Sequence, residues 1–252
     1  MSYFERAVLS GVAVVALAGF SAPASAVTMQ AVYTGTVSAS YDETGLFGLG
    51  ANVSLDGLAY ELSFIYDPAT PGAGRQTDAT IDQVLGGNGL GFVNPMISAI
   101  LTINGHSESV GGDQISLVEN YNESDGDPAN DFSQSVQLAQ DFTDDGLTEV
   151  QRRFLGFAFA NALVIPVDLE TAFSLDLLPP DTGGGSFVLT SYDHILGQSN
   201  YYANGSLNPT HLTVSRFGDV AAVPLPAALP LLLSGIAGLG ILSRRRRSKA
   251  AA

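Results

Sequence analysis

Short runs of alternating apolar and polar residues fill the chain from residue 27 to residue 218, and this pattern limits the folds that are open to it. The first run, residues 27–40, carries apolar side chains at alternate positions such as Met29, Ala31 and Tyr33. A period of two places successive side chains on opposite faces of a β-strand. Gly, Asp and Asn separate the runs at intervals of about ten residues, as turns between antiparallel strands do. We therefore predict an all-β domain.

About ten such runs favour an antiparallel β-sandwich that is jelly-roll-like in its connections. The expected strands are residues 27–40, 51–55, 58–66, 97–103, 107–110, 114–121, 136–142, 154–167, 173–177, 186–192 and 203–214. Asp56 and Gly57 lie between two of these runs and predict a tight hairpin there. Residues 81–85 and 146–153 are the helix candidates of this region.

Composition excludes several classes of protein. The chain of 252 residues has no cysteine, which rules out disulfides, thiolate zinc sites and a cysteine nucleophile. Between residues 27 and 243 only four basic side chains, all arginine, stand against 24 acidic ones. Such a negative field repels nucleic acid, so we expect no nucleic-acid partner.

The first 26 residues are typical of a secretory signal peptide. Arg6 precedes the uncharged, mainly apolar run 7–20, and Ala24 and Ala26 form a small-residue cleavage site. We predict Sec-type export and cleavage by signal peptidase after Ala26.

Residues 219–252 contain a second hydrophobic segment. Residues 221–243 carry no charge, but prolines at 224, 226 and 230 disfavour helix in the first part. A helix from Pro230 to Ser243 would rise only about 20 Å, against a bilayer core of about 30 Å. The basic residues that follow are Arg244, Arg245, Arg246, Arg247 and Lys249. These features predict a membrane-spanning helix over about residues 225–243 whose basic end stays in the cytoplasm, with the preceding domain outside.

This order of motif, hydrophobic segment and basic tail resembles the PEP-CTERM sorting signal in its VPLPA-CTERM variant. The motif residues are Val223, Pro224, Leu225, Pro226 and Ala227. The resemblance implies recognition by an exosortase, a membrane-embedded cysteine protease or transpeptidase of Gram-negative bacteria that make extracellular polysaccharide. The tail would then be a processing signal. An ordinary single-span anchor is the alternative.

One acidic segment is a candidate calcium site. Asp141, Thr143, Asp145 and Gly146 fall on positions one, three, five and six of an EF-hand-like loop, whose oxygen ligands suit Ca²⁺. The match breaks at position twelve, where Arg152 replaces the required acid. The alternative is that this segment and a second acidic segment, residues 122–131, are two solvated turns, and no other cofactor is expected.

Catalytic motifs are missing from the sequence. There is no Gly-x-Ser-x-Gly element and no pair of histidines with metalloprotease spacing around His106, His194 or His211. We therefore predict that the protein is not an enzyme. Tyr192, Tyr201 and Tyr202, beside Asn200 and Asn204, form an aromatic and amide cluster that could stack on sugars or simply pack.

Together these features predict three regions: a signal peptide (1–26), an acidic β-sandwich ectodomain (27–218) and a sorting signal (219–252). We expect a protein exported from a Gram-negative bacterium, held in the inner membrane and then placed at the cell surface or outside the cell. The expected role is structural or adhesive, with exopolysaccharide as a partner. The alternatives are a calcium-dependent carbohydrate-binding module and a secreted hydrolase.

Overall fold

The computed structural model describes residues 27–218. The expected signal peptide, with Ala24 and Ala26, and the expected sorting signal, with residues 223–227 and 244–247, lie outside the described residues. Within the described part no helix could cross a membrane.

The described domain is all-β, as predicted. Its twelve strands are β1 Met29–Asp42, β2 Ala59–Tyr66, β3 Gly74–Thr77, β4 Ile81–Gly86, β5 Met96–Ile103, β6 His106–Val110, β7 Ile115–Glu123, β8 Phe132–Asp144, β9 Thr148–Ala160, β10 Phe173–Asp176, β11 Thr182–Asp193 and β12 Gln198–Arg216. Every strand pair is antiparallel.

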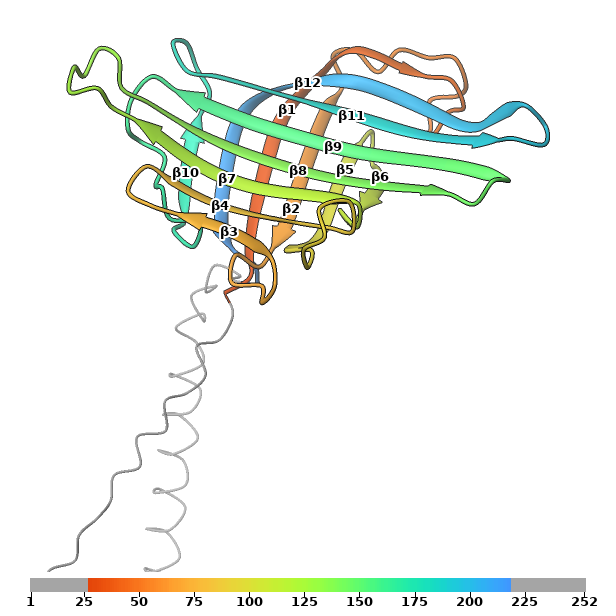
Figure 1. Cartoon of the computed structure of the whole chain (residues 1–252). Helices are drawn as coiled ribbons and strands as arrows, with labels where there is room; N and C mark the ends of the chain where they lie inside the picture. Colours follow the sequence, from red (N-terminus) through yellow and green to blue (C-terminus); the bar gives the residue numbers. More distant parts are fainter. Residues whose placement is uncertain (1–26, 219–252) are drawn as a thin grey trace, which may run out of the picture.

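All strands belong to one hydrogen-bonded sheet in the order β3-β4-β7-β8-β9-β11-β12-β1-β2-β5-β6, with β10 also paired to β12. The sheet curls so that its two halves face each other. Figure 1 shows β4, β7, β8 and β9 crossing in front of the steeply inclined β1 and β2. The single antiparallel sheet thus forms two facing layers, close to the orthogonal packing in which corner strands serve both layers.

β12 and β1 are the corner strands. The first half of β12 pairs with β11 and its second half with β10, while β1 pairs along most of its length. The β1–β12 register shifts between Thr34 and Gly35 and between Ser38 and Tyr41. Such irregularities bend a strand and increase its twist. At Gly35 a Cβ atom would lie 2.1 Å from the carbonyl oxygen of Asn208, so only glycine allows this close approach.

The core lies between the two layers. Tyr33, Phe64, Phe154 and Phe187 are among its fully buried side chains. β8 departs from the usual pattern, because its inward positions hold small or polar residues such as Ser133, Ser135 and Gln137. The Tyr33 hydroxyl donates to the Gln137 side chain, whose amide donates to the Ser135 hydroxyl at 2.9 Å. The large Tyr33 ring from the opposite layer thus occupies the space that the serines leave.

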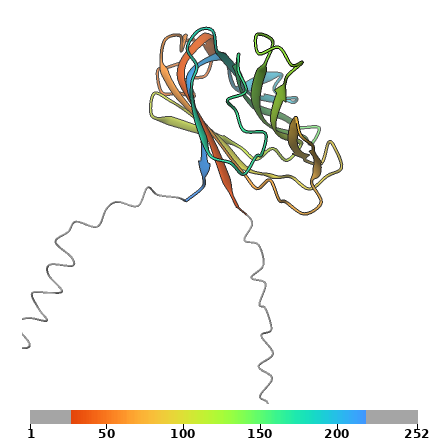
Figure 2. The same cartoon turned by 90° about the vertical axis from the view of Figure 1, so that its left-hand side faces the viewer.

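The two ends of the domain lie side by side. Met29 pairs with Arg216, and the Phe217 N–H donates to the carbonyl of Thr28 at 2.8 Å. Figure 2 shows both ends leaving the same pole of the domain. Whatever precedes residue 27 and follows residue 218 therefore meets the domain at one place.

Three expected elements were wrong. Both helix candidates are strand: residues 81–85 lie in β4, and residues 146–153 form a turn and the start of β9. The expected strand at 51–55 contributes only an isolated bridge between Val53 and Asp42. Instead, the Asp56 carboxylate accepts hydrogen bonds from the Ser40 N–H and hydroxyl, at 2.8 and 2.7 Å, which replaces the expected hairpin with a loop laid against β1.

Candidate functional site

The expected calcium ligands do not lie together on one loop. Asp141 and Thr143 belong to β8, and Asp145 lies in the tight turn to β9. Both oxygens of the Asp141 carboxylate accept backbone hydrogen bonds, from the Gly111 N–H at 2.8 Å and the Asp113 N–H at 2.7 Å. Asp141 thus fixes the loop between β6 and β7.

Asp145 has a similar structural task. Its Oδ1 atom accepts hydrogen bonds from the N–H groups of Thr148 and Leu147, at 2.7 and 2.9 Å. These two bonds lower the pKa of the Asp145 carboxyl, and nearby His194 adds a smaller effect in the same direction. Asp145 therefore stabilises its own turn.

A different set of ligand atoms converges at this end of the sheet. Asp144 and Glu149 face each other across the β8–β9 pair, and His194 reaches them from the turn between β11 and β12. One ligand atom from each residue lies within 4.8 Å of the other two. His194 Nε2 lies 3.5 Å from Asp144 Oδ1, and the His194 N–H donates to the Leu147 carbonyl at 2.9 Å. Two hairpin tips are thereby joined.

We call Asp144, Glu149 and His194 the tip cluster, and its chemistry differs from that of an EF-hand. Ca²⁺ takes oxygen ligands, whereas imidazole beside carboxylates suits first-row transition metals. Asp144 and His194 are exposed, and Glu149 is half-buried. Without an ion, the same groups form a solvated pair between an imidazole and a carboxylate.

A second cluster of polar side chains lies on the outer face of β10 and β12. In the tautomer with a proton on Nδ1, His211 donates to Asp176 Oδ1 at 2.7 Å. His211 Nε2 lies 3.1 Å from Ser174 Oγ and 2.9 Å from Thr213 Oγ1. Ser174 and Asp176 share one face because they are two positions apart on β10, and His211 pairs directly with Asp176.

These contacts follow the connectivity of a serine, histidine and aspartate triad, in which the aspartate is buried and orients the base. Here 75% of the Asp176 side chain is exposed, so water competes for its carboxylate. Thr213 also occupies the same imidazole nitrogen as Ser174. The group is therefore better explained as a cross-strand polar network on an exposed sheet.

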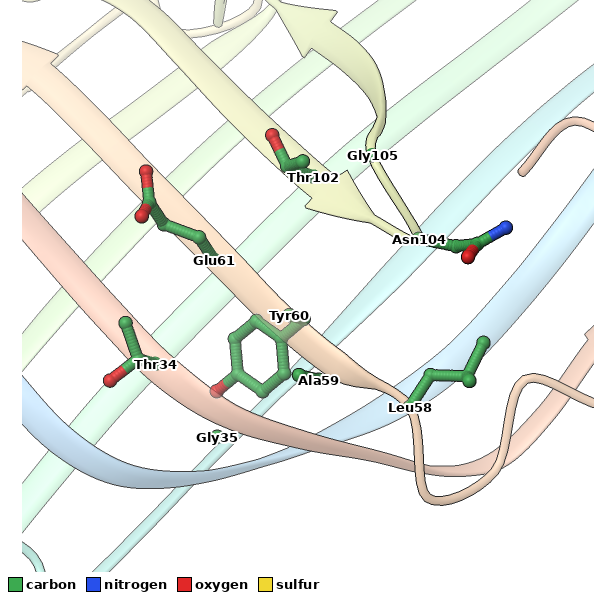
Figure 3. Close-up of a pocket in the computed structure, with 9 residues that line it drawn as sticks. All are labelled: Thr34, Gly35, Leu58, Ala59, Tyr60, Glu61, Thr102, Asn104 and Gly105. Atoms are coloured by element: carbon green, nitrogen blue, oxygen red, sulfur yellow. The ribbon is translucent and has the colours of Figure 1, made fainter. Parts of the chain in front are cut away.

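A shallow hollow of about 600 Å³ lies on the same outer face. Figure 3 shows Thr34, Glu61 and Thr102 on three neighbouring strands around it. Register places these residues in one row with His211, which pairs with Thr34. The row offers hydroxyls and one carboxylate, which can bind water or polar ligands.

The tyrosine and asparagine cluster predicted from the sequence is divided by the sheet. Tyr201 and Tyr202 are consecutive in β12, so their side chains point to opposite faces. The Tyr201 hydroxyl accepts from Arg152 Nε at 2.9 Å, and the Arg152 guanidinium lies 5.3 Å from the Tyr201 ring centre. On the other face, the Asn204 amide donates to the Tyr202 hydroxyl at 2.6 Å. The cluster does not form one stacking surface.

Sequence reasoning missed both polar groups because their members come from different hairpins. The visible signals were the adjacent Asp193 and His194, and the spacing of Ser174 and Asp176. Neither signal indicates which strand lies beside these residues in the fold. Comparison of the chain with protein-family models, with curated proteins and with solved structures found no match.

Proposed function

We propose that this chain is an exported surface protein, sorted by an exosortase of a Gram-negative bacterium, with a structural or adhesive and non-catalytic role in an extracellular polysaccharide matrix. The observation that carries the proposal is the order of residues 223–227, the uncharged hydrophobic segment and the basic residues 244–249. In this proposal signal peptidase removes residues 1–26 after Sec-type export, and the inner membrane holds the chain until the exosortase acts.

Two properties of the described domain support this proposal. Its last strand ends at Arg216, only a few residues before Val223, so a domain held by the tail would sit close to its anchor. The acidic surface and the absence of cysteine suit a soluble domain that is independent of the redox state around it. In this role we interpret the two facing layers as a sandwich-type ectodomain.

The test is the intact mass of the protein recovered from the membrane and medium of the cells that make it. We expect a chain that begins at Val27 and ends near Val223, with any excess mass identifying an attached group. Pro226→Ala should block this processing, whereas Pro230→Ala, outside the motif, should leave it unchanged. A mass running from Val27 through Ala252 would contradict exosortase processing and indicate a plain membrane anchor.

The calcium-dependent carbohydrate-binding module stays the alternative prediction, and the tip cluster sharpens its test. If calcium binds as the sequence predicts, Ca²⁺ raises the melting temperature and Asp141→Ala removes the increase. If the convergent atoms are the site, Zn²⁺ raises the melting temperature and His194→Ala removes the increase. In thermal melts followed by circular dichroism, no change with Ca²⁺ would contradict the calcium-dependent module, and no change with Zn²⁺ would contradict a metal site at Asp144, Glu149 and His194.

A secreted hydrolase is the second alternative, and Ser174, His211 and Asp176 are the residues at which it can be tested. A hydrolase predicts turnover of ester or glycoside substrates that Ser174→Ala abolishes and Thr213→Ala retains. The non-catalytic proposal predicts no turnover by the native chain. A panel of chromogenic esters and glycosides separates the two, with His211→Ala as a second inactive control.

A further inference from the structure

The outer face of β8 and β9 carries an apolar row, although the protein as a whole is strongly acidic. On β8 and β9 the buried, inward positions alternate with outward ones that include Val136, Leu138, Leu155 and Phe157. Figure 1 shows these strands in the front layer. An outward row of apolar side chains on a sheet face is typical of a contact surface.

A hollow of about 460 Å³ lies within this face. Its walls come from three adjacent strands and include Gln134 from β8, Phe157 and Phe159 from β9, and Thr182 from β11. Phe159 stacks on Phe132, with ring centres 5.1 Å apart and ring planes inclined by 26°. The hollow therefore has one rigid aromatic wall.

Phe157 lines the hollow, and a glycine explains its position. A Cβ atom on Gly184 would lie 2.4 Å from Phe157 Cζ and 2.7 Å from Cε1, so the ring lies directly over the glycine of the neighbouring strand. Phe157 still keeps 39% of its surface exposed. A ring that rests on a sheet and leaves its other side open is a platform for stacking.

The polar groups around this platform are uncharged. Among the described residues that line the hollow none is ionisable, and Gln134 and Thr182 supply an amide and a hydroxyl. Glu119 is not part of the lining, and its two oxygens accept hydrogen bonds from Gln134 at 3.0 Å and Gln83 at 2.6 Å. The lining thus offers apolar contact and neutral hydrogen bonds together.

The charge of the domain narrows the class of ligand. Residues 27–218 contain 23 acidic and four basic side chains, so an acidic polysaccharide or a second copy of this domain would be repelled as it approached. A neutral sugar avoids this repulsion. It also matches the lining, because sugar rings combine an apolar face with hydroxyl groups.

We propose that this hollow binds a neutral polysaccharide, with Phe157 stacking on a sugar ring and Gln134 and Thr182 bonding its hydroxyls. The site deepens the matrix role proposed above, and it rests on that proposal only for the expectation that polysaccharide is present. Processing of the tail and binding at the hollow are measured separately, so either can fail without the other.

The experiment measures binding of the full-length chain, kept in detergent, to soluble glucan, mannan and galactan by affinity electrophoresis, with polygalacturonate as the acidic comparison. We expect at least one neutral polymer to bind and the acidic polymer not to bind. Phe157→Ala should weaken binding about tenfold through loss of the platform. Gly184→Ala should also weaken it, because the added methyl group displaces the ring. Phe92→Ala removes a similarly exposed phenylalanine, 47% against 39%, and should change nothing.

Circular dichroism melts of each variant show whether the fold is kept, and Gly184→Ala tests the ring position without removing an aromatic side chain. Absence of binding to all neutral polymers would overturn the proposal. Binding that Phe157→Ala and Gly184→Ala both leave unchanged would also overturn it. Self-association that Phe157→Ala abolishes, seen in sedimentation velocity without glycan binding, would assign the face to contact between copies instead.

Discussion

The buried carboxylate of Asp82 should be one of the most sensitive positions in the domain. Its side chain is only 2% exposed and accepts four hydrogen bonds. Arg75 donates from Nη2 at 2.8 Å and from Nε at 3.1 Å, the Thr77 hydroxyl donates at 2.9 Å, and the Leu169 N–H donates at 3.1 Å. Asp82 therefore ties the β3–β4 hairpin to the loop between β9 and β10.

Removal of this carboxylate should cost about 3 kcal/mol of unfolding free energy. Breaking a buried ion pair typically costs about 3–5 kcal/mol because the remaining partner is left unpaired. Here the Arg75 side chain is 32% exposed and can be hydrated, which favours the lower end of that range. The buried N–H of Leu169, by contrast, loses its acceptor. At about 2–4 °C per kcal/mol for a domain of this size, Asp82→Ala should lower the melting temperature by about 6–12 °C.

The assay is urea unfolding followed by far-UV circular dichroism, since the chain has no tryptophan. Glu61→Ala removes an exposed carboxylate and should stay within about 0.5 kcal/mol of the native chain. A double-mutant cycle with Arg75→Ala should show clear coupling between Arg75 and Asp82. Equal effects of Asp82→Ala and Glu61→Ala, or additive effects within the cycle, would refute this reasoning.

Three further predictions concern the core and the pH dependence of stability. Gly156→Ala would place a methyl group 2.8 Å from the Tyr33 ring, so thermal melts should show a loss of about 1–3 kcal/mol from overpacking; an unchanged melt would contradict this. Burial raises the pKa of Tyr33 and Tyr66. The contribution of these two neutral tyrosines to the free energy of unfolding is complete below the tyrosine pKa of about 10 in the unfolded chain, and it is lost as pH rises above that value. The urea midpoint should therefore fall from about pH 10 upward. Hydrogen bonds from the hydroxyl and N–H of Ser40 lower the pKa of Asp56. The contribution of Asp56 to the free energy of unfolding is present above about pH 4 and is lost as pH falls through the pKa of the folded state. The decrease of the urea midpoint at low pH should therefore be smaller in Asp56→Asn than in the native chain.

Much of the strand content could be predicted because alternation survives wherever one face of a strand is buried. The run 58–66 matches β2, and the run 97–103 matches β5 within one residue at each end. The helix prediction for residues 146–153 was wrong, although their composition is compatible with a helix. In the structure most of them belong to β9, which is paired with β8 on one side and with β11 on the other. Long-range pairing overrides weak local preference.

The curl of the sheet and the polar groups could not be predicted in the same way. The bends in β1 depend on close approach at Gly35, which looks like any other glycine in the sequence. His194 meets Asp144 only because β9 lies between β8 and β11 in the sheet, and this order is a property of the fold. Residue spacing identified candidate ligands on one segment, whereas the convergent atoms come from two hairpins.

The position of β12 also determines how the domain would carry tension. If the chain is held through the segment after Gly218 while a load acts on the opposite end of the domain, the pull enters at the end of β12 and runs along that strand. The hydrogen bonds between antiparallel strands are perpendicular to the strand axis. The hydrogen bonds between β12 and β1, from the pair Met29–Arg216 to the pair Asp42–Ala203, would therefore be loaded at the same time. They would not break one after another. Under such a pull the domain would yield by shear of a whole strand, which is the mechanically resistant direction of a sheet.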